Sequence, residues 1–229
     1  MTPICSRPCQ DVWVSSAPRR YGGVSAEERI AERRGRFLEA GLELMGNRGV
    51  AGTTVRGLAE HTGLAARYFY ESFDGIEALQ LAVFEEIAVE ALTRALAALD
   101  ATTGGADTDL ARTHAVITEM VDLMLEDPRK GRITLIESVS SPVLGPRVLQ
   151  ESRRFAALLA TTASGGDPSA VADELPARLR VTAQFLIGGV AHALGAVLHG
   201  DLETDREELV DVLVDLFLTV DRSLRSPRA

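Results

Sequence analysis

The sequence has few of the residues that mark several common classes of protein. Aromatic residues make up only 5% of the 229 positions, and the two cysteines, Cys5 and Cys9, both lie in the N-terminal stretch. With no histidine near them they imply neither a disulfide framework nor a zinc site, and they suit a reducing cytoplasm. No run of alternating β-branched residues predicts a sheet. These absences argue against a disulfide-rich secreted scaffold and against an all-β fold.

Targeting and membrane signals are also missing. Residues 1–24 have no apolar core of the kind that a signal peptide needs, and their Pro, Ser and Gly content predicts a disordered tail. The longest apolar run, near Phe185 to Leu198, is too short to span a membrane and contains His192. We therefore expect a cytoplasmic protein with no membrane partner.

The residue patterns of common active sites are absent too. Ser138, Ser140 and Ser141 cluster, but no Gly-x-Ser-x-Gly motif surrounds them. His192 and His199 are seven residues apart, whereas a helical metal pair more often uses a spacing of four. We expect no catalytic residue, no metal and no cofactor. An enzyme built on a helical body stays as a weaker alternative, which turnover of a bound ligand would reveal.

Charge is distributed unevenly along the chain. The net charge is −9, yet residues 1–75 carry ten Arg against nine acidic residues, while residues 76–229 carry fourteen basic residues against twenty-four acidic ones. A nearly neutral N-terminal part can still present a basic face to phosphates. The charge balance therefore permits nucleic-acid binding by the first third of the chain.

What the sequence does contain is helix-forming apolar sequence. Hydrophobic residues make up 46%, mostly Ala, Leu and Val, which favours an all-α fold with helices packed on helices. Caps, breaks and periodicity predict helices over 25–47, 74–99, 109–126, 146–163, 176–198 and 205–224, with a further segment at 129–139. Capping boxes are expected for the first two, at Ser25 with Glu28 and at Asp74 with Glu77.

The stretch from Thr53 to Phe73 reads as two short helices joined by a tight turn. Thr54 can cap the first helix, and Gly63 can end it in a left-handed conformation. In the second helix, Phe69 and Phe73 lie four residues apart on one face. Two short helices with a glycine turn between them predict a helix-turn-helix.

This stretch resembles the DNA-binding signature of the TetR family of bacterial regulators. The matching positions are Leu58-Ala59, Thr62-Gly63, Phe69-Tyr70, Phe73 and Glu77-Ala78-Leu79. The resemblance implies a helix-turn-helix DNA-binding domain, expected at 25–73, joined by a long helix to an effector-binding and dimerisation domain at 74–229. It also implies a homodimeric repressor that binds a palindromic double-stranded DNA operator and is released by a small effector.

The DNA contacts are expected from the turn and the second helix. Arg67 can reach a guanine edge or a phosphate, Tyr68 a thymine methyl or the backbone, and Tyr70 fills the family position that commonly touches phosphate. The other reading is a set of exposed side chains around an aromatic core. The full set of candidates is Thr54, Arg56, Ala66, Arg67, Tyr68, Tyr70 and Glu71.

Three positions depart from the family pattern. Gly57 stands where an acidic capping residue is common, Ala65 where Ser or Thr usually caps the second helix, and Ile76 where a lysine commonly contacts DNA. These departures keep a second function open, that of a helical ligand-binding or scaffold protein with degenerate DNA binding.

The central helices are the expected site of a small, mainly apolar effector. They interleave apolar side chains with a few polar groups, which is typical of a ligand pocket and also of an ordinary core. The candidate lining residues are His114, Ile117, Met120, Val121, Met124, Glu137, Phe155, Gln184 and Phe185.

The last two helices are the expected dimer interface. Both are apolar around much of their circumference, which ordinary core packing explains only in part, and small residues on the first would let a second helix come close. A four-helix bundle with a symmetry mate would bury these faces. The candidate interface residues are Val181, Gly188, Gly189, His192, Ala196, Leu209, Leu213, Leu216 and Val220.

Overall fold

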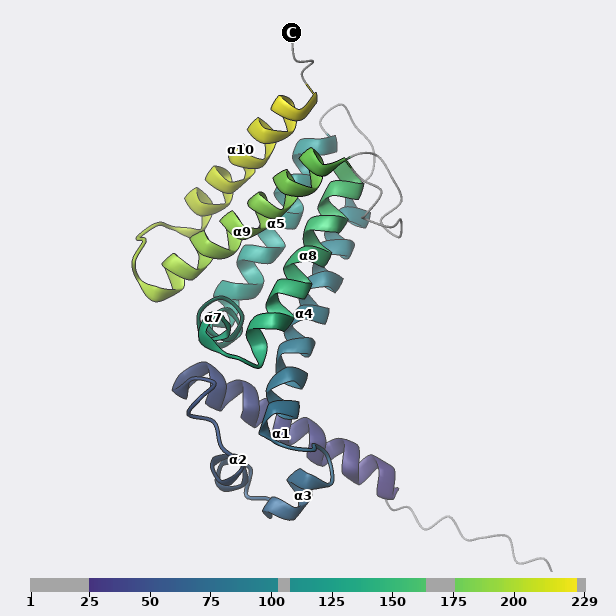
Figure 1. Cartoon of the computed structure of the whole chain (residues 1–229), viewed down its shortest axis with the longest axis vertical. Coiled ribbons are helices and arrows are strands. Elements are labelled where there is room, and N and C mark those ends of the chain that lie inside the picture. The colour runs from purple at the N-terminus through teal and green to yellow at the C-terminus, as the bar shows by residue number, and fades with distance from the viewer. Residues whose placement is uncertain (1–24, 103–107, 164–175, 226–229) are drawn as a thin grey trace, which may run out of the picture.

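The computed structural model describes residues 25–102, 108–163 and 176–225, so the tail expected at 1–24 lies outside the described residues. The all-α prediction is confirmed, since the described part contains helices and no strand (Figure 1). The elements are α1 (Ala26–Arg48), α2 (Val55–Thr62), α3 (Ala66–Tyr70), α4 (Ile76–Ala101), α5 (Thr108–Glu126), α6 (Pro128–Gly131), the π-helical segment η1 (Arg132–Glu137), α7 (Ser138–Ser140), α8 (Leu144–Ala163), α9 (Ala177–His199) and α10 (Arg206–Arg225).

Two ends of the molecule differ in how the helices are arranged. Helices α1 to α3 form a small head at the bottom of Figure 1, and α4 rises from it into the body. In the body α4 packs against α5 and α8, α8 packs against α9, and α5 against α10. The long helix α4 is therefore shared by head and body.

The first helix begins where its sequence predicts. The Glu28 N–H donates to Ser25 Oγ at 3.0 Å, and the Ser25 N–H donates to Glu28 Oε2 at 2.6 Å, which confirms the capping box. The helix ends at Gly49, whose φ of 81° lies in the region that favours glycine.

The helix-turn-helix is present, with a second helix shorter than expected. The Gly57 N–H donates to Thr54 Oγ1 at 3.1 Å, and Gly63 ends α2 in a left-handed conformation at φ 69°, as predicted. Helix α3 stops at Tyr70, so Phe73 lies beyond it. The rings of Phe69 and Phe73 still stack with centroids 5.4 Å apart, which keeps both on the buried side.

The capping box expected at the start of the long helix is wrong. Helix α4 begins at Ile76, and Gly75 occupies its N-cap position without a side chain to bond the first turn. Asp74 lies one residue too early to serve as the cap. The acidic residue Glu77 remains in the first turn, where it suits the helix dipole.

The hydrophobic core has two main clusters. The first fills the head around Phe37, Leu58 and Phe69, and it continues into the body through Ile133 and Leu144, all five fully buried. The second lies between α5, α9 and α10. The first cluster thus crosses the boundary expected at residues 73 and 74, and the head is packed against the body.

Candidate functional site

Three arginines of α1 contact the helix-turn-helix. The Arg33 guanidinium lies 4.4 Å from the centroid of the Tyr68 ring and 3.0 Å from Glu71 Oε2. Arg34 lies 4.5 Å from the Phe73 ring centroid, and Arg36 donates to the Thr62 carbonyl at the end of α2. These cation–π and hydrogen-bond contacts hold α1 against the end of α2 and against α3 and the turn after it.

The exposed face of α3 presents arginine and tyrosine to solvent. Arg67 Nη2 donates to Tyr68 Oη at 2.8 Å, and this hydrogen bond raises the pKa of Arg67 above its ordinary value. Tyr70 is 62% exposed and meets the Phe69 ring edge-on. Arg56 is exposed on α2 and pairs with Glu60 at 2.8 Å. Arg67, Tyr70 and Arg56 therefore form a cationic and aromatic surface.

The remaining candidate DNA contacts divide into exposed and engaged residues. Thr54 and Ala66 are exposed beside this surface. Tyr68 is partly buried between Arg33 and Arg67, and the exposed Glu71 is held by Arg33. Pairing with Arg33 reduces the repulsion that the Glu71 carboxylate would exert on phosphate.

The three departures from the family pattern have visible consequences. Ala65 gives α3 no side-chain cap, and the Leu64 N–H instead donates to Thr62 Oγ1 at 3.3 Å. Ile76 packs against the first core cluster and offers no charge to DNA. Gly57 leaves Thr54 as the whole side-chain cap of α2.

A joint between head and body is built around the turn after α1. Glu137 Oε2, at the end of η1, accepts a hydrogen bond from the Val50 N–H at 3.1 Å, and Gln80 Nε2 of α4 donates to the Val50 carbonyl at 3.1 Å. A Cβ on Gly49 would lie 2.8 Å from Glu137 Oε2. Glu137 was expected in the effector pocket, and the structure places its carboxylate on the head.

The joint continues where α6 meets the last turn of α1. A Cβ on Gly46 would lie 2.5 Å from the Cβ of Arg129, so only glycine allows this approach. The Arg129 guanidinium bonds Glu43 Oε2 at 2.7 Å and Asp127 Oδ2 at 2.8 Å. The hydrogen bond from Arg129 lowers the pKa of Asp127 below its ordinary value.

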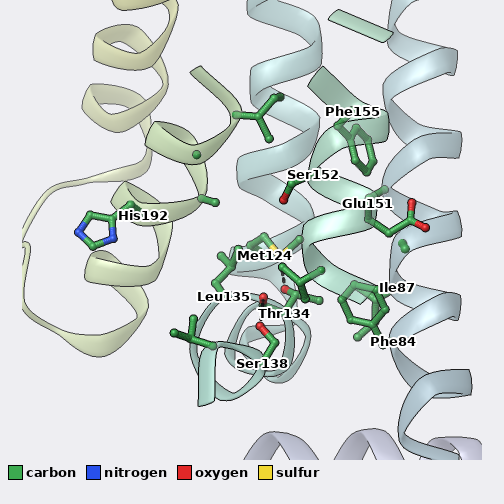
Figure 2. Close-up of a pocket in the computed structure, with 17 residues that line it drawn as sticks. Phe84, Ile87, Met124, Thr134, Leu135, Ser138, Glu151, Ser152, Phe155 and His192 are labelled. Atoms are coloured by element: carbon green, nitrogen blue, oxygen red, sulfur yellow. Dashed lines mark hydrogen bonds between the residues drawn. The ribbon is translucent and has the colours of Figure 1, made fainter. Parts of the chain in front are cut away.

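An apolar cavity of about 290 Å³ lies on the other side of the same segment (Figure 2). Its wall comes from α4, α5, η1, α7, α8 and α9. Apolar side chains dominate, and the polar lining groups are few; the lining includes Phe84, Ile87, Met124, Thr134, Leu135, Ser138, Val148, Glu151, Ser152, Phe155 and His192. Thr134, Leu135, Ser138 and Val139 flank Glu137 in sequence, so cavity and joint share one short segment.

Of the nine residues expected in an effector pocket, Met124 and Phe155 line this cavity. Ile117 and Val121 lie in the second core cluster, with Met120 packed against it. The other expected residues lie elsewhere: His114 is exposed and within 3.3 Å of Thr118, Gln184 is partly buried, and Phe185 is 72% exposed. The periodicity of the sequence predicts that α5 has an apolar face, but it does not indicate which helix packs on that face. The lining hydroxyls of η1 and α7 had no sequence signal.

The candidate interface on α9 is exposed, and that on α10 is divided. Val181 is 69% exposed, Leu216 is 54% exposed, and Gly188, Gly189 and His192 are exposed as well. Ala196 and Val220 are partly buried. Leu209 and Leu213 are each only 5% exposed because they pack in the second core cluster. Both helices therefore leave large apolar side chains uncovered, Val181 and Phe185 on α9 and Val212 and Leu216 on α10.

Helix α9 is also long and apolar enough, by length and composition alone, to cross a membrane, and 11% of its apolar window is buried. One such helix is weak support for a membrane span. Among the described residues, no group of three His, Cys, Asp or Glu side chains is placed to hold a metal ion.

A helix-turn-helix head with an exposed Arg and Tyr surface, joined by one long helix to a helical body with a cavity, is an arrangement typical of ligand-responsive DNA-binding regulators. A family model described as bacterial regulatory proteins, tetR family, matches residues 37–83, which cover most of the head and the start of α4. Residues 37–83 therefore resemble the DNA-binding part of the TetR family of transcriptional regulators.

Solved structures extend the likeness in fold to the body. A TetR-family regulator from Syntrophomonas wolfei has a TM-score of 0.67 at 17% identity, covering 83% of this chain and 95% of that one. The fatty acid degradation regulator FadR from Bacillus halodurans has a TM-score of 0.64 at 16% identity, covering 80% and 97%. FadR from Bacillus subtilis in complex with stearoyl-CoA has a TM-score of 0.62 at 16% identity, covering 79% and 95%. No curated protein matches the chain in sequence.

Proposed function

We propose that the protein is a homodimeric repressor that binds a palindromic operator and is released from it by a small, mainly apolar effector. The observation that carries the proposal is the shared segment from Thr134 to Val139, which lines the cavity and holds the head through Glu137. A bound molecule there would touch the same short segment that grips the head.

DNA binding is supported by the composition of the exposed face of α3. Arg67 and Tyr70 project from a helix that Phe69 anchors in the core, and Arg56 lies beside them on α2. In a two-fold dimer the two copies of α3 would read half-sites about one DNA turn, roughly 34 Å, apart.

A dimer is supported by the uncovered surface of α9. Phe185 is 72% exposed and Val181 69%, on a helix whose apolar window is only 11% buried. Large apolar side chains left in water on one face mark an interaction surface. The exposed glycines at 188 and 189 would let the same helix of a second copy come close. In this reading a second copy covers the surface, and the protein is cytoplasmic.

The shared segment and α4 would together couple effector binding in the cavity to DNA binding by the head. An effector that moves Thr134 or Ser138 shifts the neighbouring Glu137, and an effector against Phe84 or Ile87 acts on α4 directly. Either displacement changes the spacing of the two reading helices, and the effector shifts the population by its differential affinity for the two spacings. Bacillus subtilis FadR, whose fold is similar, was solved in complex with stearoyl-CoA, which supports a small-molecule ligand for this protein too.

The deciding experiment is binding of the full chain to its own upstream DNA at several salt concentrations. We expect specific binding that weakens as salt rises, because phosphate contacts release counterions. Arg67→Ala should weaken binding by about 1–3 kcal/mol, and Tyr70→Phe by less. Arg153→Ala, which removes an exposed arginine from α8 of the body, is the control and should leave binding unchanged. No specific, salt-sensitive binding to any promoter fragment would refute the repressor.

The second candidate function is a helical ligand-binding or scaffold protein with degenerate DNA binding. The uncapped start of α3 at Ala65 and the apolar Ile76 favour it, since each removes a group that the family commonly uses. It predicts that Arg67→Ala and Tyr70→Phe leave the cellular function intact. An enzyme would differ from both by turning over the bound ligand.

A further inference from the structure

The wall of the cavity offers a bound molecule almost no charge. Its surface is mainly the hydrocarbon of side chains such as Phe84, Ile87 and Phe155. Two of its residues, Glu151 and His192, have side chains able to carry charge. The position of these two groups therefore decides which ligands the cavity can hold.

Neither of these groups presents a free charge to the interior. The Glu151 carboxylate lies 3.3 Å from an Arg147 nitrogen and 3.8 Å from an Arg154 nitrogen, so it is already paired. In Figure 2 it points away from Ser152, and the His192 ring points away from the other labelled side chains. His192 is exposed to solvent. An ionic head group inside the cavity would have no opposite charge to meet.

The lining hydroxyls differ in whether their hydrogen-bonding capacity is used. Thr134 Oγ1 donates to the Lys130 carbonyl at 2.8 Å, and Ser138 Oγ donates to the Thr134 carbonyl at 2.6 Å. Ser152 Oγ has no hydrogen-bond partner among the described residues. Figure 2 shows it directed toward the side of the cavity where Met124 lies. Ser152 is the lining hydroxyl that is free to donate to a ligand.

We propose that the cavity selects a small, uncharged, hydrocarbon-rich molecule with one hydroxyl or carbonyl group that bonds Ser152. The inference rests on the proposed effector site and deepens it. The small size follows from the cavity volume of about 290 Å³, which lies at the lower end of the roughly 300–1,000 Å³ of small-molecule pockets. The neutral class follows because an ionised group buried without a partner is strongly disfavoured.

The test compares three molecules that share one eight-carbon chain: 1-octanol, octanoate and protonated octylamine. Each is titrated into the full-length wild-type protein at pH 8, with calorimetry for affinity and the melting temperature as a second readout. We expect 1-octanol to bind at least about tenfold more tightly than either ion. Equal or tighter binding of octanoate or octylammonium would overturn the neutral class.

Two variants locate the site. Ser152→Ala should weaken 1-octanol binding about threefold to tenfold, the worth of one neutral hydrogen bond, whereas Ser140→Ala, an exposed serine outside the lining, should not. Ala88→Phe places a ring in the cavity wall and should abolish binding in protein whose circular dichroism is unchanged. Unaltered affinity in Ser152→Ala would remove that serine from the site, and unaltered affinity in a folded Ala88→Phe would place the ligand elsewhere.

Operator binding measured with the same ligands separates this inference from the repressor function. Release of DNA by octanoate and not by 1-octanol would overturn the neutral class and leave a ligand-regulated repressor. Tight 1-octanol binding with no effect on any DNA complex would keep the neutral cavity and overturn the regulatory function.

Discussion

The head and the body differ in how completely they bury their large apolar side chains. In the head, Phe37 and Phe69 are fully buried with ring centroids 5.5 Å apart, and little large apolar surface is left over. In the body, α9 leaves Val181 and Phe185 mostly in water. The surface of the head therefore displays mainly polar and cationic groups, whereas the body exposes apolar side chains that the proposed dimer would cover. Substitutions at matched positions can break or sharpen this contrast.

The largest effect is expected from Phe69→Ala. It removes a fully buried ring that contacts Phe37, Tyr70 and Phe73, and the cavity left behind should cost about 3–5 kcal/mol of unfolding free energy. Denaturant unfolding measures the loss. Phe185→Ala is the matched control, because the same truncation at a 72% exposed ring should change the stability of the isolated subunit little. Equal losses at the two positions would contradict the contrast.

Next in size is the effect of Phe185→Glu on assembly. A charge buried without a partner in an interface should weaken the proposed dimer by about 2–5 kcal/mol, and analytical ultracentrifugation over a range of concentrations would show monomers. Val89→Glu introduces the same charge at a 63% exposed valine of α4 and should leave assembly unchanged. A dimer that survives Phe185→Glu would move the interface away from this face of α9.

A smaller effect is expected at the joint. Glu137→Ala leaves the Val50 N–H without its acceptor and should cost about 1–2 kcal/mol of unfolding free energy. It should also reduce the effect of a ligand on operator affinity, because the cavity segment would no longer hold the head. Glu137→Gln keeps an acceptor oxygen and serves as the control. If ligand release of DNA is identical in Glu137→Ala and wild type, the coupling runs through α4 alone.

The smallest effect is a pH dependence of the α1–α6 contact. Hydrogen bonds from Arg129 lower the pKa of Asp127 in the folded protein, so this carboxylate stabilises the fold fully above its unfolded pKa of about 3.9. That stabilisation is lost as the pH falls through the lower folded value. Unfolding free energies measured between pH 6 and pH 3 should therefore fall less steeply in Asp127→Asn than in wild type. Parallel curves would show that the pair contributes nothing in solution.

Local features were predictable from the sequence, and features made by distant segments were not. The caps at Ser25 and Thr54 and the left-handed Gly63 depend on residues within three positions, which a sequence displays directly. The box predicted at Asp74 is wrong because α4 begins at Ile76, so that Gly75 and not Asp74 occupies the cap position. Local patterns could not decide between them.

The cavity and the joint required knowledge of which helix faces meet. Periodicity marked Val121 as apolar, and only the packing of α10 on α5 turns it away from the cavity. Glu137 and Val50 are 87 residues apart, and no local pattern relates them. The π-helical segment η1 places Thr134 in the cavity wall and Glu137 against the head. It likewise has no periodic signal in the sequence.

Ile133 and Leu144 of the body are buried in the same core cluster as the aromatic residues of the head, which has a consequence for synthesis. Ribosomes add roughly 5–20 residues per second, so several seconds pass between completion of Phe73 and the arrival of Leu144. For most of that interval the nascent chain lacks both Ile133 and Leu144, and for the rest of it Leu144 is still missing from the core cluster. The part of the protein that is made first is thus among the last to close, and a chain halted before residue 144 would leave the ribosome with an unsealed head.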